Sequence, residues 1–152
     1  MQRRKFLNNC AAIGSTGVAL GMGVLPPGIA FAEESDPFQA TSVDAVLRAL
    51  GVAGAEPSDD IKIVAPKVAE NGAAVPVGIT SSISETTEIM TIVAANPKPL
   101  AARSRFGKGA AASVDSRIKM GRTTELIAVV KAGGRYYMAR TDVKVTVGGC
   151  GG

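Results

Sequence analysis

Apolar and polar side chains alternate in short stretches from residue 61 onward in this sequence of 152 residues. The alternation is clearest in residues 114–120, VDSRIKM, where the even positions are apolar or small and the odd positions are charged. A period of two places successive side chains on opposite faces of a β-strand, so that one face is buried and the other is solvated. The chain is therefore expected to fold mainly into antiparallel sheet.

Further strands are predicted on the same basis, and prolines and glycines separate them as tight turns would. They cover residues 61–65, 74–83, 89–94, 100–106, 124–131 and 136–147. Residues 124–131 are largely apolar, which predicts a central strand of the sandwich. About seven short strands at this spacing predict an immunoglobulin-like antiparallel β-sandwich.

Three turns are predicted from glycine, at Asn71-Gly72, at residues 107–109 and at residues 133–134. Asn-Gly is the strongest short hairpin signal, so Asn71-Gly72 is expected to join the first two strands directly. Pro66 and Pro76 lack the backbone donor that a central strand needs. We therefore expect their strands to lie at an edge or to contain a bulge.

One segment before the strands has a helical period instead. Between residues 42 and 50 the apolar side chains recur at i, i+3, i+4 and i+7. Thr41 or Ser42 can cap the first turn, and Gly51 can end the helix. A short amphipathic helix over residues 42–50 is expected to pack on another element.

Residues 1–32 are predicted to be an export signal. Arg3 and Arg4, followed by KFL, fit the twin-arginine pattern, and residues 30–32, AFA, form a typical cleavage site. Cleavage is expected after about Ala32, which predicts a periplasmic protein. Four glycines and two prolines interrupt the apolar stretch before it could span roughly 30 Å of hydrocarbon, so no membrane anchor is predicted.

Removal of this signal changes the charge of the chain. Three of its 17 basic residues are lost and 14 remain against 13 acidic ones, so the formal net charge falls from +4 to about +1. With few aromatic residues as well, the chain is not expected to bind nucleic acid. The sequence has no histidine, so Ser-His-Asp and Cys-His catalysis are excluded. We predict no catalytic residue, no metal site and no cofactor.

Cys150 is the only cysteine that remains, because Cys10 lies within the predicted signal. An unpaired thiol in an oxidising compartment is either linked to another molecule or kept for its reactivity. Because glycine has no Cβ, a glycine-rich segment can enter channels closed to ordinary side chains. The glycines around the thiol are Gly148, Gly149, Gly151 and Gly152.

The thiol is also expected to stand clear of the fold. Three extended residues beyond Val147 carry it about 10 Å from the last predicted strand. The predicted organisation is therefore a signal over residues 1–32, a β-sandwich domain over residues 33–147, and a flexible arm over residues 148–152.

The sequence resembles the SoxY family, the sulfur-carrying proteins of bacterial thiosulfate oxidation. Besides the twin-arginine start, four segments carry the resemblance: APKVAENGAAVPV at 65–77, NPKPLA at 96–101, SRIKM at 116–120 and VKVTVGGCGG at 143–152. It implies a carrier rather than an enzyme, with sulfur intermediates held covalently on Cys150. It also implies a heterodimer with SoxZ and transient contacts with the cytochrome SoxXA, the hydrolase SoxB and the sulfane dehydrogenase SoxCD.

Two alternative functions remain open at this point. Gly151-Gly152 is similar to the end of ubiquitin-like sulfur carriers, which form a terminal thiocarboxylate, although their cytoplasmic ATP-dependent activation does not suit an exported protein. A structural sandwich subunit could instead use Cys150 only for an intermolecular disulfide. The chemical state of Cys150 distinguishes these hypotheses.

Overall fold

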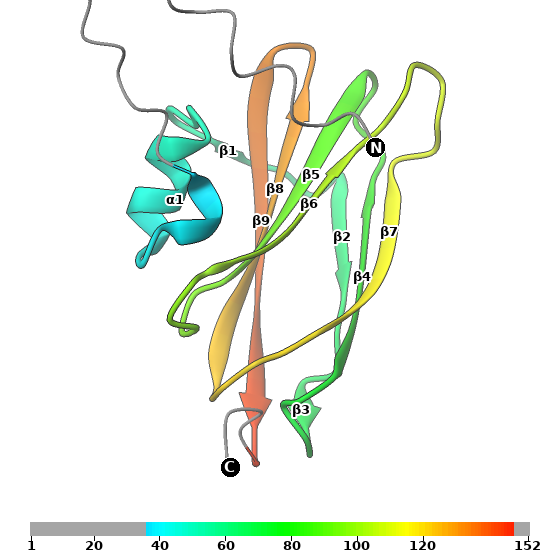
Figure 1. The fold of residues 1–152 in the computed structure, drawn as a ribbon. Helices are drawn as coiled ribbons and strands as arrows, with labels where there is room; N and C mark the ends of the chain where they lie inside the picture. The colour runs from blue at the N-terminus through cyan, green and yellow to red at the C-terminus, as the bar shows by residue number, and fades with distance from the viewer. Residues whose placement is uncertain (1–35, 148–152) are drawn as a thin grey trace, which may run out of the picture. The chain divides into compact units, whose positions relative to one another are not determined.

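The computed structural model describes residues 36–147, which Figure 1 shows as a strand-rich fold with one short helix. In chain order the elements are η1 (Pro37–Gln39), α1 (Val43–Ala49), β1 (Glu56–Pro57), β2 (Ile61–Val64), β3 (Val68–Ala69), β4 (Val75–Ser81), β5 (Thr86–Val93), β6 (Leu100–Arg105), β7 (Ser113–Ile118), β8 (Thr124–Ala132) and β9 (Arg135–Val145). The predicted signal, with Arg3 and Arg4, and the predicted arm, with Cys150, lie outside the described residues.

The strands form two sheets with a shared core. The larger sheet has the order β1-β9-β8-β5-β6, with β3 also paired to β9, and the smaller has the order β2-β4-β7. Buried side chains of both sheets form one cluster, which includes Val77 and Ile79 of β4 and Leu126 and Val130 of β8. The predicted immunoglobulin-like β-sandwich is therefore confirmed.

A second apolar layer lies on the other face of the larger sheet, where α1 packs (Figure 1). Val46 of the helix is buried with Met90 of β5 and with Ile127 and Val129 of β8. Both β5 and β8 are therefore buried on two faces, which explains their largely apolar sequences. The predicted central strand is confirmed, since β8 lies between β9 and β5.

The helix itself agrees with its prediction. Ser42 is the N-cap, with its side-chain oxygen accepting from the amide of Ala45 (3.2 Å), and Leu50 is the C-cap. Gly51 follows with a φ of 68°, a left-handed conformation that favours glycine at this position.

The predicted hairpin at Asn71-Gly72 is wrong. β2 pairs with β4 so that Val64 lies opposite Gly78, and the connection between these strands contains β3. Asn71 instead forms a local turn in which its Oδ1 accepts from the amide of Ala73 (2.8 Å). An Asn side chain can satisfy such a turn without a hairpin, so the dipeptide alone did not determine the connection.

A two-residue hairpin does occur at the predicted turn over residues 133–134. Ala132 and Arg135 are paired there, and Gly133 and Gly134 have φ values of 55° and 77°. Two successive positive φ angles are typical of the type I′ turn, whose twist suits antiparallel strands.

Pro76 lies in the middle strand of the smaller sheet and yet has a strand on only one side. It pairs with Arg117 of β7, whereas β2 has already ended opposite Gly78. The position is thus a local edge, which tolerates the missing backbone donor. Pro66 lies outside the strands, in the connection that follows β2.

Glu88 of β5 is a buried carboxylate, with an exposed fraction of 5%. Its Oε1 accepts from Nε of Arg103 (2.7 Å) and from Nε of Arg105 (2.9 Å), and its Oε2 accepts from Nη2 of Arg103 (3.2 Å). Burial raises the pKa of Glu88, but the hydrogen bonds and charges of the two arginines outweigh burial and hold this pKa below its ordinary value.

Acid should therefore weaken the fold through Glu88. Because its pKa is lower in the folded chain, its stabilisation is complete above the unfolded pKa of about 4.3 and is lost as the pH falls through the folded value. Urea unfolding at a series of pH values should show this loss. Glu88→Gln should flatten the curve in that range, whereas Glu70→Gln, at an exposed carboxyl group, should not. An unchanged curve for Glu88→Gln would contradict the assignment.

Candidate functional site

The predicted sulfur attachment site, Cys150, lies outside the described residues, as do Gly148, Gly149, Gly151 and Gly152. The structure does describe the segment from which the predicted arm extends. This segment is residues 145–147, which we call the arm root. It comprises the last residue of β9 and the two residues that follow.

One side of the arm root is bound by β3 and the residues after it. The two strands run parallel, with Ala69 opposite Val145. The amide of Thr146 donates to the carbonyl of Ala69 (3.0 Å), and the amide of Gly72 donates to the carbonyl of Val147 (2.8 Å). The ladder therefore continues past the end of β9 as far as Val147.

The other side of the arm root is bound by a threonine. Oγ1 of Thr123 accepts from the amide of Val145 (3.0 Å) and donates to the carbonyl of the same residue (3.4 Å). On the β3 side, Oγ1 of Thr146 also donates to the carbonyl of Glu70 (3.1 Å). The backbone is thus hydrogen-bonded at Val145 to Thr123 and at Thr146 and Val147 to the β3 side, and Cys150 lies three residues beyond Val147.

The loop that binds the arm root is itself tied to the smaller sheet. The carbonyl of Gly72 accepts from the amide of Met120 (2.7 Å), two residues after β7. Gly72 thus joins the end of β9 to the segment after β7 with its two backbone groups. This link gives the arm root a support that includes both sheets.

A hollow of about 500 Å³ lies beside the arm root, and we call it the basic hollow. Its lining residues are Lys67, Thr123, Thr141, Asp142 and Lys144. The backbone connects it directly to the arm root, because the amide of Lys144 donates to the carbonyl of Lys67 (2.9 Å) and Thr123 binds Val145. Two lysines and one aspartate thus line a space next to the origin of the arm.

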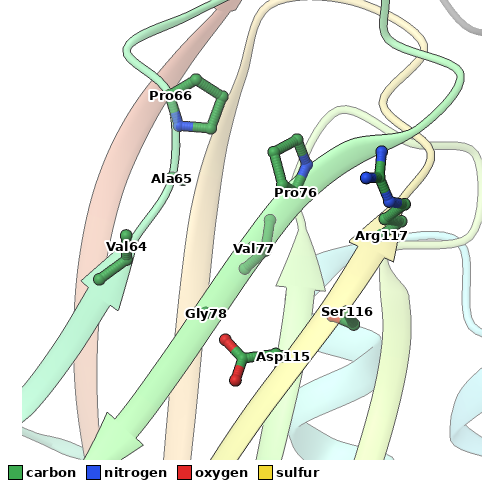
Figure 2. A pocket seen from close by; sticks show the side chains of 9 residues that line it. All are labelled: Val64, Ala65, Pro66, Pro76, Val77, Gly78, Asp115, Ser116 and Arg117. Carbon is green, nitrogen blue, oxygen red and sulfur yellow. The ribbon is translucent and has the colours of Figure 1, made fainter.

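Figure 2 shows a second hollow, of about 690 Å³, on the outer face of the smaller sheet. Val64 and Pro76 give it apolar walls, and Asp115 and Arg117 line its β7 side. Gly78 lies on its floor, and a Cβ there would lie 2.8 Å from Oδ1 of Asp115, so that this side chain would have to move. Ser116 also lines this hollow, and the sequence has no histidine that could activate its hydroxyl.

Apolar side chains are exposed close to the arm root as well. Val68 of β3 has an exposed fraction of 52%, and Val147 has one of 63%.

Within residues 36–147, no group of three or more His, Cys, Asp or Glu side chains is placed to hold a metal ion. Among the same residues, no helix is long and apolar enough to cross a membrane.

Sequence reasoning missed the residues that hold the arm root. Gly72 was interpreted as part of a hairpin, and Thr123 has no distinguishing pattern around it. Both act through partners far along the chain, since Thr123 binds Val145 and Gly72 binds Val147. Local periodicity carries no information about such contacts, which follow from the pairing of β3 with β9 for Gly72 and from the register of the β8–β9 hairpin for Thr123.

Comparison with known proteins identifies relatives of this fold. Residues 47–150 match the family model described as Sulfur oxidation protein SoxY. The structure is similar to that of the sulfur carrier protein SoxY from Chlorobium limicola f thiosulfatophilum, with a TM-score of 0.62 and 38% identity over 68% of this chain and 94% of that chain. No curated protein sequence matches the chain.

Two structures of superoxide reductase (neelaredoxin) from Ignicoccus hospitalis are similar as well. Each has a TM-score of 0.50 and 20% identity over 56% of this chain, and the matches cover 78% and 79% of those chains. At this level of identity, the likeness shows a shared sandwich fold alone.

The β-sandwich and the match over most of the chain place this protein among the sulfur oxidation proteins. Within that class, the chain belongs to the SoxY family. The predicted family is therefore confirmed, and membership implies partners from the Sox system in general.

Proposed function

We propose that this protein is a sulfur carrier that holds intermediates of thiosulfate oxidation covalently on Cys150. Family membership supports the carrier role, since the related Chlorobium protein is a sulfur carrier. The observation that carries the assignment is the arm root, where Thr123 binds Val145 on one side and the β3 segment binds Thr146 and Val147 on the other. A rigid support followed three residues later by a thiol between glycines suits a group that must reach into other proteins.

The thiol is proposed to be worked on by partner enzymes rather than to act as a catalyst. The sequence has no histidine that could serve as its base. A carrier that visits several active sites has no need of its own acid or base, because each site can supply one. On this proposal the protein is a covalent substrate with no cofactor, and SoxXA, SoxB and SoxCD are its transient partners.

We also propose that the protein is periplasmic and forms a heterodimer with SoxZ. Arg3 and Arg4 support export of the folded chain by the twin-arginine route, with cleavage after about Ala32. Export in the folded state would allow a partner without a signal of its own to leave the cytoplasm already bound. Such a partner should be recovered with the protein from the periplasm.

Mass spectrometry of the periplasmic protein tests these proposals. The expected chain begins at Glu33 and, after incubation with thiosulfate and the partner enzymes, gains sulfur-containing groups that map to Cys150 and are released by a thiol reductant. Sulfur in place of a carboxylate oxygen on Gly152 would instead indicate a thiocarboxylate carrier. A disulfide-linked dimer with no sulfur adduct would support a purely structural role for the thiol.

A further inference from the structure

The basic hollow contains charges that other described residues do not neutralise. The side chains of Lys67, Lys144 and Asp142 form no ion pair or hydrogen bond with another residue of the 36–147 segment. Two ammonium groups against one carboxylate leave this space with a net positive charge. Lysine ammonium groups are common ligands of oxyanions, to which they donate up to three hydrogen bonds.

The hollow is within reach of cargo on Cys150. Lys144 lies three residues before Val147, or about 10 Å along an extended strand at 3.3 Å per residue. Cys150 lies three residues after Val147, which is about 10 Å of extended chain. A reversal of direction at Gly148 and Gly149, which glycine permits, would bring the thiol level with Lys144.

We propose that the basic hollow is a docking site for an oxyanion, namely the sulfonate group of cargo carried on Cys150. This inference rests on the proposed function. A thiosulfate-derived adduct ends in a sulfonate with a negative charge and three acceptor oxygens, which suits the ammonium groups of Lys67 and Lys144. The sulfonate adds a negative charge to the arm, so the hollow would hold a loaded arm more strongly than an arm with a neutral thiol. Asp142 opposes the docking and limits its strength.

The test uses protein recovered from the periplasm and loaded chemically with tetrathionate. The Cys150 thiolate attacks a sulfane sulfur of tetrathionate and displaces thiosulfate, which leaves Cys–S–S–SO₃⁻. A second sample is capped with iodoacetamide, which gives a neutral adduct. In amide NMR spectra, the signals of Lys67, Thr123 and Lys144 should shift with the sulfonate, and the shift should shrink in high salt. Equal shifts with the neutral cap, or none with the sulfonate, would overturn the proposal.

If charge attraction holds the arm, variants that change a charge in the hollow should change the ratio of docked to free arm in a predictable direction. Lys144→Gln should lower the ratio of docked to free arm roughly two- to fivefold, which is the size expected for one exposed ion pair. Asp142→Asn should raise the ratio by a similar factor, again about the size of one exposed charge interaction. Lys62→Gln, at an exposed lysine on β2 in the other sheet, is the matched control and should change nothing. Weaker docking in Asp142→Asn would contradict the proposal that electrostatic attraction binds the sulfonate in the basic hollow.

Failure of this inference and failure of the proposed function remain distinct. Tetrathionate loads Cys150 without partner enzymes, so absent docking would leave the carrier function untouched. Conversely, docking of the tetrathionate-derived sulfonate without any enzymatic loading of Cys150 would support the anion site and refute the carrier function.

Discussion

Replacement of Cys150 with serine should reduce thiosulfate-dependent turnover of the reconstituted Sox proteins to the background rate. A serine hydroxyl does not ionise near neutral pH and cannot form the sulfur–sulfur bond that the proposed carrier needs. The fold should be unaffected, because the changed residue lies beyond the arm root. Oxygen uptake with thiosulfate measures the first effect, and urea unfolding measures the second, with an expected change within about 0.5 kcal/mol.

The other cysteine supplies the matched control for this experiment. Cys10 lies in the proposed signal, so Cys10→Ser should leave both turnover and the sulfur adduct at the level of the unchanged protein. Substantial turnover by Cys150→Ser would refute the carrier function. Loss of turnover together with a large loss of stability would show that Cys150 has a structural role.

The sequence predicted the longer elements well because their signals are local. Alternation identified β7, a long apolar run identified β8, and the capping residues identified α1. The two-residue strands β1 and β3 were missed. Each pairs in parallel with β9, more than seventy residues later in the chain, and two residues are too few to show a period. Asn71-Gly72 was misleading because its turn serves the end of β9 and not a hairpin.

The candidate site divides in the same way. Cys150 could be selected from the sequence, because counting cysteines and predicting an export signal require no knowledge of contacts. Its support could not be selected. Gly72 and Lys67 become neighbours of the arm root only through the pairing of β3 with β9, and Thr123 does so through the register of the β8–β9 hairpin. The basic hollow was hidden for this reason, since Lys67 and Lys144 look like ordinary surface charges in the sequence.

The second apolar layer leads to the largest expected effect on stability. Ile127 lies on the face of β8 that α1 covers, with an exposed fraction of 2%, and it belongs to one cluster with Val46 and Met90. Ile127→Ala should therefore lower the free energy of unfolding by about 2–5 kcal/mol, the usual cost of a cavity in a buried core. A sandwich with only one core would leave this face in water, and the change would then cost little.

Urea unfolding at neutral pH measures that difference. Val64→Ala is the matched control, because Val64 is also a strand residue with a branched apolar side chain but has an exposed fraction of 61%. Its expected change lies within about 0.5 kcal/mol, as for most surface substitutions. A cost for Ile127→Ala no larger than that of Val64→Ala would mean that α1 does not seal the outer face of β8. The apolar sequence of β5 and β8 would then need another cover, such as a partner subunit on the same face.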